Sequence, residues 1–308
     1  MGNILITGAS GFMGKALGER LSAESHQLVL LDSKSADLTK DSSLIKYNDL
    51  KYDLIFHLAA WTQAGDFCLL HQGEQWVINQ QINTNTLSWW QKYQPQAKLI
   101  AFGTSVSYAV EENLSEDNYM LGIPNEKFYS YAMTKRMLYS GLVSLRRQFG
   151  MRYLYAVPST LYGPGYHTDG RQMHFIFDLI RKIIRGKEYG EQVILWGDGN
   201  QRRELVYIDD FIQILLRLSE QVDNELINIG AGEDYSIRDF ASHICDLIGY
   251  DYSLISFDTT KYVGAKSKCL NVSKLKALLP DLERTSLQEG LNKTIEWFYK
   301  GKFYDLSS

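Results

Sequence analysis

The chain has 308 residues, a formal net charge of −4, 45% hydrophobic residues and 22% charged residues. This size and composition allow one large domain, or two closely joined ones, with a substantial core. The slightly acidic balance argues against nucleic acid or an anionic membrane as the main partner, and no window approaches the roughly eighteen apolar residues of a membrane span. Three scattered cysteines predict free thiols and no metal site, and the N-terminus lacks a signal-peptide pattern, so we expect a cytoplasmic protein.

In the first half, short apolar runs alternate with helical stretches, which is typical of a parallel sheet covered by helices. The pattern predicts strands at 3–7, 27–31, 54–58, 98–103 and 152–158, with helices at 12–24, 72–93 and 127–149. After Pro158 the rhythm changes. There we expect short strands at 193–196 and 204–208, with helices at 172–186, 209–220, 236–248 and 286–299.

This order of elements predicts an α/β fold, namely a Rossmann-type doubly wound parallel sheet with a smaller C-terminal substrate-binding lobe. The expected dinucleotide-binding domain comprises 1–165 with parts of 205–230, and the expected substrate lobe comprises 166–204 and 231–308.

Three glycines follow the first predicted strand and open the first predicted helix with the spacing G-x-x-G-x-x-G. Such a turn lets backbone amides approach a pyrophosphate, and the helix N-terminus favours its negative charge. Glycines at a strand-to-helix turn can also serve tight packing alone, and that alternative stays open here. If the turn binds a dinucleotide, the predicted cofactor-binding residues are Gly8, Ser10, Gly11, Phe12, Met13 and Gly14.

Asp32 ends the second predicted strand, where a carboxylate can accept hydrogen bonds from the adenosine ribose; a solvated loop acid is the alternative. The same carboxylate would repel the additional phosphate of NADP, which favours NAD(H), although Lys34 nearby could offset this and leaves NADP(H) open. Further cofactor contacts are expected at the adenine edge and at the ends of later strands, from Asp37, Leu38, Leu58, Ala59, Ala60 and Pro158.

Tyr131 and Lys135 lie one turn apart on one face of a predicted helix. An ammonium close to a phenol favours the phenolate, which would lower a pKa that is ordinarily about 10. Tyr131 is then a candidate acid or base in hydride transfer, Lys135 can also hold the nicotinamide ribose, and Thr104 can add a second hydrogen bond. The alternative is an exposed helical pair without a catalytic role.

The glycine turn, His57-Leu-Ala-Ala60, Gly103-Thr-Ser-Val-Ser-Tyr108, the Tyr131–Lys135 pair and Pro158-Ser-Thr-Leu-Tyr-Gly-Pro164 together resemble the extended short-chain dehydrogenase/reductase family, the NAD-dependent epimerases/dehydratases. Within it, the chain is similar to GDP-L-fucose synthases, the GDP-4-keto-6-deoxymannose epimerase-reductases. The likeness continues through 195–205 and 228–232 to 271–275, nearly the whole chain. It implies a nucleotide-sugar substrate and a homodimer formed by the helices at 72–93 and 127–149.

The resemblance implies that Thr104, Tyr131 and Lys135 are catalytic and that His174 matches an acid of the fucose synthases. By the same likeness, Trp196, Arg203 and Lys268 match residues near the sugar nucleotide. On charge alone, Lys187 is a further candidate for the substrate's diphosphate, and some of these cations could instead be solvated surface charges.

The chain departs from that family pattern at three positions. By this resemblance, Val106 occupies the position of the cysteine base of fucose synthases, and Thr160 occupies that of a substrate-contacting asparagine. Asp32 does not suit the NADPH of those enzymes. Because valine cannot exchange a proton, epimerisation beside the ketone is in doubt.

We therefore predict a nucleotide-sugar oxidoreductase that moves hydride between NAD(P)(H) and C4 of a GDP-linked deoxyhexose or heptose. The direction that we favour is 4-keto reduction, in the synthesis of surface-polysaccharide sugars. Two alternatives stay open. One is a 4-epimerase or 4-dehydrogenase that retains NAD, and the other is a non-catalytic NAD(P)-sensing regulator.

Overall fold

The computed structural model describes residues 2–109, 113–261 and 266–305. At its centre lies a six-stranded sheet with the order β10-β5-β4-β3-β1-β2, and every neighbouring pair is parallel. The predicted Rossmann-type doubly wound fold is confirmed. The strands are β1 (Asn3–Thr7), β2 (Gln27–Leu31), β3 (Leu54–His57), β4 (Lys98–Phe102), β5 (Tyr153–Pro158) and β10 (Glu225–Ile229).

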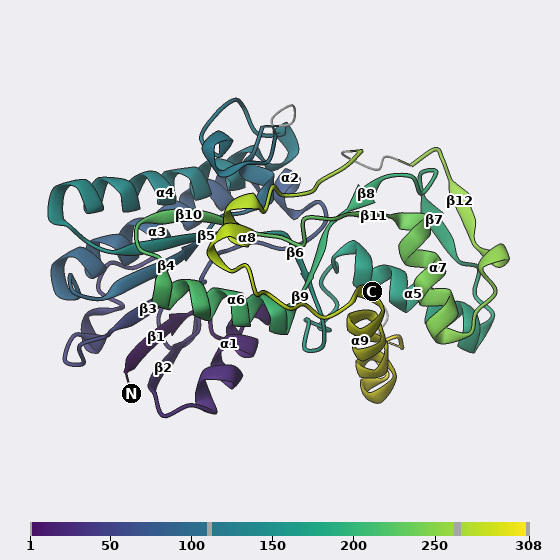
Figure 1. Cartoon of the computed structure of the whole chain (residues 1–308), viewed down its shortest axis with the longest axis horizontal. Coiled ribbons are helices and arrows are strands. Elements are labelled where there is room, and N and C mark those ends of the chain that lie inside the picture. Colours follow the sequence, from purple (N-terminus) through teal and green to yellow (C-terminus); the bar gives the residue numbers. More distant parts are fainter. Residues whose placement is uncertain (1, 110–112, 262–265, 306–308) are drawn as a thin grey trace.

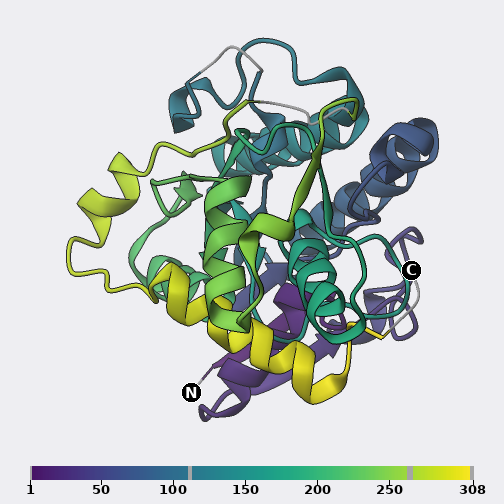
Figure 2. The same ribbon diagram turned by 90° about the vertical axis from the view of Figure 1, so that its right-hand side faces the viewer.

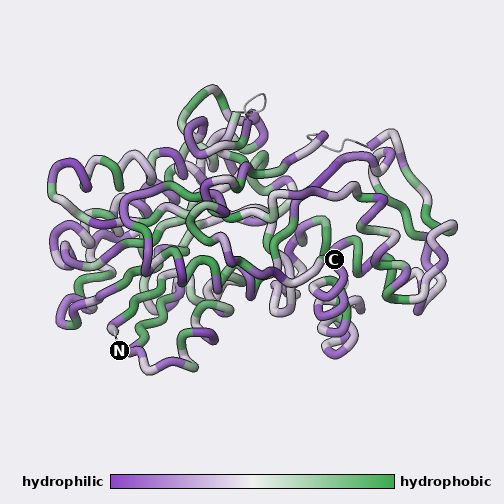
Figure 3. Tube along the Cα trace, in the orientation of Figure 1, coloured by the Kyte–Doolittle hydropathy of each residue, from purple (hydrophilic) through white to green (hydrophobic). Residues whose placement is uncertain are grey.

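The central strands are apolar along their length because helices cover both faces of the sheet (Figures 1 and 3). Ile4, Leu5 and Ile6 of β1 are at most 1% exposed. From β1 the chain moves to β2 on one side and then to β3 on the other, so the strand order reverses there. In open α/β sheets a crevice forms at such a reversal, beyond the carboxyl ends of the strands.

Four helices form the outer layers of this domain. Helices α1 (Phe12–Ser22) and α6 (Ile208–Gln221) pack together on one face, and α3 (Gln72–Tyr93) and α4 (Tyr129–Phe149) pack together on the other (Figure 1). Helix α4 ends at Gly150, whose φ of 72° provides the left-handed cap that favours glycine.

A second hydrophobic core lies beyond the carboxyl ends of the strands and belongs to a smaller lobe. Its helices α5 (Phe175–Tyr189), α7 (Ile237–Ile248) and α9 (Leu287–Gly301) lie in front in Figure 2. Three two-stranded sheets connect or complete this lobe, made from β6 (Thr160–Tyr162) with β9 (Leu205–Tyr207), β7 (Ile194–Trp196) with β12 (Ser256–Asp258), and β8 (Arg202–Arg203) with β11 (Tyr235–Ser236).

The structure differs from the sequence predictions in several elements. Strand β10, the short strands β6, β8, β11 and β12, and the short helices α2 (Phe67–Leu70) and α8 (Ser273–Leu278) were not predicted, and α5 begins at Phe175 rather than at 172. Leu270, Leu275 and Leu279 join the core of the large sheet, so this segment packs outside the lobe to which the sequence assigned it. Within the described residues, no helix combines the length and apolarity of a membrane span, and no acidic, histidine or cysteine cluster suits a metal.

Candidate active site

A cleft of about 2320 Å³ separates the sheet from the smaller lobe. Small-molecule pockets commonly measure about 300–1,000 Å³, so this cleft has room for a dinucleotide together with a second nucleotide-sized ligand. All the residues that the sequence assigned to cofactor, catalysis and substrate line it, with the exception of Lys187.

The glycine turn between β1 and α1 is shaped for close approach of a ligand. Gly8 has a φ of 69°, and a Cβ there would lie 2.8 Å from the backbone nitrogen of Ala59. Gly11 is the N-cap of α1, and no side chain caps the helix at this point. The first amides of α1 therefore face the cleft, which suits a pyrophosphate. These residues fit a dinucleotide.

Asp32 is held in one orientation at the end of β2. Its Oδ1 accepts hydrogen bonds from the backbone amides of Lys34, at 3.1 Å, and Ser35, at 2.8 Å, and from the Ser35 hydroxyl at 2.9 Å. The bonds from Ser35 are the main cause that lowers the pKa of this carboxyl below its ordinary value. A carboxylate of fixed orientation thus lines the cleft at the end of β2.

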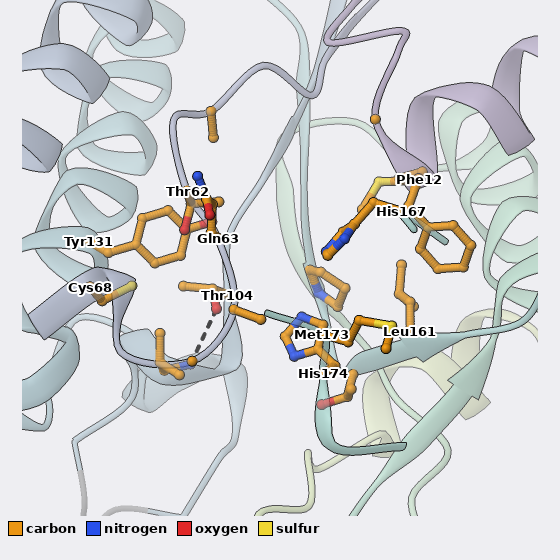
Figure 4. A pocket seen from close by; sticks show the side chains of 18 of the residues that line it. Phe12, Thr62, Gln63, Cys68, Thr104, Tyr131, Leu161, His167, Met173 and His174 are labelled. Carbon is orange, nitrogen blue, oxygen red and sulfur yellow. Dashed lines mark hydrogen bonds between the residues drawn. The ribbon is translucent and has the colours of Figure 1, made fainter. Parts of the chain in front are cut away.

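Three of the four predicted catalytic residues line one wall of the cleft and come from two elements, and Figure 4 shows Thr104 and Tyr131 of this wall. Thr104 follows β4 in an extended conformation, and its Oγ1 accepts a hydrogen bond from the backbone amide of Val106. Tyr131 and Lys135 belong to the first turns of α4, with the Lys135 ammonium 5.7 Å from the centre of the phenol ring. Thr62, Gln63 and Cys68 complete this wall, although the sequence analysis did not include them.

The electrostatics of the pair differ from the prediction. Burial raises the pKa of Tyr131 above its ordinary value, and the nearby Cys68 and Tyr119 add to this, while the hydrogen bond with Thr62 opposes it. Burial also lowers the pKa of Lys135 to about 8. The expected lowering of the tyrosine pKa is therefore wrong for this structure, because desolvation of the buried phenol is the largest cause of its shift. At neutral pH Tyr131 is a protonated phenol.

A buried polar chain supports this wall from behind. The Thr7 hydroxyl lies 3.0 Å from Nδ1 of His57, whose Nε2 lies 3.2 Å from Oδ1 of Asn83. Asn83 in turn donates to the backbone carbonyl of Thr134 on α4. Burial and the charge of Lys135 lower the pKa of His57 to about 4, so this histidine is neutral at physiological pH. The chain connects β1, β3, α3 and α4 beside Lys135.

The opposite wall carries two histidines that face the cleft (Figure 4). His174 is the N-cap residue of α5 and is accessible from the cleft. Its surroundings, first through desolvation and then through the charges of His167 and Lys268, hold its pKa below the ordinary value. His167 packs against Tyr166 with the rings tilted by 35° and their centroids 4.1 Å apart, and its place in the cleft was not predicted from the sequence. Its position just after the Gly163-Pro-Gly165 turn was the available signal.

The same wall carries the predicted substrate residues Thr160, Trp196, Arg203 and Lys268. Trp196 is 55% exposed and so has a free aromatic face. Burial and the neighbouring Arg203 lower the pKa of Lys268 to about 8, and the Lys268 ammonium lies 5.6 Å from the centre of the Phe128 ring. Two cationic side chains therefore stand close together in the cleft, which suits a diphosphate. Residues 262–265, in the stretch that led the sequence analysis to Lys268, lie outside the described residues.

Lys187 requires a correction. Its ammonium donates a hydrogen bond of 2.5 Å to the backbone carbonyl of Ile248, at the end of α7, and it does not line the cleft. A lysine at a helix C-terminus satisfies a carbonyl that lacks a partner within the helix. The charge of Lys187 therefore serves the packing of α5 against α7.

Comparison with known proteins agrees with this geometry. The model of the NAD dependent epimerase/dehydratase family matches residues 4–230, most of the chain. The chain belongs to this family. One relative is a GDP-L-colitose synthase of Yersinia pseudotuberculosis. Its sequence is 27% identical to this one, and the match covers 98% of this chain and 99% of the relative.

Solved structures show the same fold as this family member. A GDP-L-fucose synthetase from Naegleria fowleri superposes with a TM-score of 0.87 at 23% identity, covering 97% of this chain and 94% of that chain. A GDP-6-OMe-4-keto-L-xylo-heptose reductase from C. jejuni gives 0.86 at 22% identity, with coverage of 97% and 98%.

Proposed function

We propose that the protein is an NAD(P)H-dependent reductase of the C4 ketone in a nucleotide-activated sugar, with a GDP-linked deoxyhexose or heptose as substrate. The observation that carries this proposal is the pair of hydroxyls on one wall of the cleft. Tyr131 is a protonated phenol at neutral pH, and Thr104 stands on the same wall. A phenol can donate a proton to an oxygen, whereas oxidation of an alcohol requires a phenolate to accept one. A protonated Tyr131 suits reduction, a direction that the name of the GDP-6-OMe-4-keto-L-xylo-heptose reductase from C. jejuni also supports.

Each side chain then has a definite task. A bound NAD(P)H supplies the hydride. Tyr131 gives its phenolic proton to the C4 oxygen, and Thr104 donates a second hydrogen bond to the same oxygen. Lys135, one helical turn away, stabilises the negative charge that remains on the tyrosine and can hold the nicotinamide ribose.

On the substrate side, Arg203 and Lys268 would bind the diphosphate, and Trp196 offers its face to the nucleotide or the sugar. His167 and His174 reach the cleft opposite the catalytic hydroxyls, where hydroxyls of a sugar ring need hydrogen-bond partners. The relatives named for GDP-sugars support the choice of GDP, and synthesis of a surface-polysaccharide sugar is the proposed role.

Reduction without epimerisation is the proposed outcome. Val106 lines the cleft beside Thr104, and its side chain carries no group that exchanges protons. To test this, the protein is incubated in D2O with GDP-4-keto-6-deoxymannose and either NADH or NADPH, and the products are followed by NMR. A sample without protein corrects for spontaneous exchange. We expect reduction at C4 without deuterium at C3 or C5. Deuterium at these carbons would contradict the absence of epimerisation, and no reaction with either cofactor would contradict the reductase.

For the cofactor we propose NAD(H), because the oriented carboxylate of Asp32 would repel a phosphate on the same ribose. Initial rates with NADH and NADPH should favour NADH by about tenfold or more in kcat/KM, a difference of about 1.4 kcal/mol. Asp32→Asn should reduce that preference. Equal use of both cofactors by the wild-type protein would refute the proposal.

The same carboxylate favours a second candidate, a 4-epimerase or 4-dehydrogenase that retains NAD. Its signature is tightly bound NAD in the purified protein and turnover of a 4-hydroxyl sugar. The ultraviolet spectrum of the protein-free extract, with enzymatic assay of its NAD content, distinguishes it from a reductase that consumes NADH.

We also propose a homodimer through α3 and α4. Trp76 and Val77 of α3 and Met137 of α4 are 37%, 52% and 44% exposed, which is unusual for several large apolar side chains on adjoining helices. Light scattering should give the mass of two chains, and Val77→Glu should shift it towards one. If light scattering of the wild-type protein at micromolar concentration gave the mass of one chain, the proposed dimer would be refuted.

A further inference from the structure

The hydroxyls proposed for catalysis stand on two separate elements. Thr104 follows β4, whereas Tyr131 and Lys135 project from α4. Both hydroxyls must reach one substrate oxygen, and a misplacement of about 1 Å can cost about 100-fold in rate. Some tertiary contact must therefore set the position of α4 relative to the end of β4.

Two buried tyrosine hydroxyls make such a connection. Tyr155 of β5 donates a hydrogen bond of 2.6 Å to the backbone carbonyl of Lys135. Its oxygen lies 3.2 Å from the hydroxyl of Tyr119, which lies against the segment that carries Thr104. Both tyrosines are 0% exposed. The two tyrosine hydroxyls thus connect the segment of Thr104 with the backbone carbonyl of Lys135.

Gly103 shows how closely the tyrosines press on the catalytic segment. A Cβ at this position would lie 2.7 Å from the Tyr119 hydroxyl oxygen and 2.9 Å from Cε1 of Tyr155. The backbone of Gly103 is not in the left-handed region, so its conformation does not require glycine. The missing side chain makes room for the tyrosine pair directly before Thr104.

Packing alone does not account for the two hydroxyls. Phenylalanine at both positions would fill nearly the same space, and replacing both partners of a buried hydrogen bond by apolar groups can be nearly neutral for stability. A carbonyl inside a helix already accepts the amide four residues on, so that of Lys135 needs no further donor. The hydroxyls therefore do something other than fill the core.

We propose that Tyr119 and Tyr155 are positioning residues whose hydroxyl pair sets the separation between Thr104 and the Tyr131–Lys135 turn of α4. The inference rests on the proposed ketoreductase function. In it, the pair allows both hydrogen bonds to the C4 oxygen to form at once, without either tyrosine touching substrate.

The test uses the full-length protein with NADH and GDP-4-keto-6-deoxymannose. Tyr155→Phe and Tyr119→Phe should each lower kcat about tenfold, with KM within twofold, because the ground-state contacts to substrate are unchanged. The deuterium isotope effect with 4-deuterated NADH should rise, since hydride transfer becomes rate-limiting. The double variant should fall little below the lower single variant, because both hydroxyls belong to one chain.

Tyr153→Phe is the matched control. Tyr153 is a buried tyrosine of the same strand whose hydroxyl is bonded to Tyr139 of α4, but this bond does not lead to Thr104. Its kcat should stay within twofold of wild type. A loss equal to that of Tyr155→Phe, or unchanged kcat in both test variants, would overturn the proposal.

If the wild-type protein reduces no 4-keto sugar, the proposed function fails. The proposed role of Tyr119 and Tyr155 in positioning α4 can then still be tested by crystallography. Crystal structures of the wild type and of Tyr155→Phe then supply the distance between Thr104 Oγ1 and the Tyr131 hydroxyl. We expect this distance to change by about 0.5 Å or more, the tolerance of a preorganised site. The same distance in both structures would overturn the proposal.

Discussion

The two walls of the cleft are built in different ways. The sheet wall takes its groups from the ends of parallel strands and from one helix, so that a glycine turn and a tyrosine–lysine pair suffice to place them. The wall of the smaller lobe collects His167, Trp196, Arg203 and Lys268 from three distant parts of the chain, and Trp196 and Arg203 belong to strands of three and two residues. Rigid elements thus carry the proposed chemistry, and loops with short strands carry the proposed substrate binding.

The largest effect is expected on the sheet wall. Tyr131→Phe should lower kcat by about 100-fold or more, because the proton donor for the C4 oxygen is lost. Stopped-flow measurement of NADH oxidation checks this, and Tyr129→Phe is the control, since Tyr129 is 44% exposed and lies outside the cleft. Full activity in Tyr131→Phe would remove the catalytic role from Tyr131. NAD(P) binding without turnover in the wild type would instead support a regulator that only senses NAD(P).

On the opposite wall the effect should appear in KM. Arg203→Ala removes a charged hydrogen-bond donor, which is worth about 1.5–3 kcal/mol, so KM for the nucleotide sugar should rise about tenfold or more. The change in kcat should be smaller, because the diphosphate is remote from the reacting carbon.

Lys187→Ala tests the position of Lys187 outside the cleft, and steady-state kinetics should show an unchanged KM. If Lys187→Ala raised KM as much as Arg203→Ala, the diphosphate would bind elsewhere than in the cleft described here.

The smallest effect concerns stability towards acid. His57 behind the sheet wall is 1% exposed with a pKa near 4, whereas an unfolded histidine takes up its proton near pH 6.5. Below pH 6.5 the unfolded chain therefore gains a proton that the folded chain refuses until about pH 4. Over that window the free energy of unfolding should fall by up to about 1.4 kcal/mol per pH unit from this residue.

Urea denaturation at several pH values, with wild type and His57→Gln, measures this slope. His57→Gln should show a shallower one. His174→Gln should reduce the slope less than His57→Gln, because the pKa of His174 is also held below its ordinary value but solvent in the cleft screens this residue. Parallel curves for wild type and His57→Gln would contradict the expectation.

The sequence alone determined much of the fold and of the sheet wall. Buried parallel strands are continuous apolar runs in the sequence. The Gly8–Gly14 turn and the Tyr131–Lys135 pair each involve residues only a few positions apart. These features are local, so their residues could be named before any contact was known. Strand β10 was missed because its five residues follow a helix with only Asn224, in a positive φ, to mark the boundary.

Only the tertiary structure decided the rest. It placed Lys187 on the carbonyl of Ile248 and His167 in the cleft, because charge and residue type do not say which segments meet. It also reversed the pKa shift of Tyr131, since desolvation depends on every element packed around the phenol. The hydrogen bond from Tyr155 to the Lys135 carbonyl joins residues that are 20 positions apart, so no local sequence pattern predicts it. Helix and strand periodicity are short-range properties, whereas burial and the assembly of a cleft belong to the whole chain.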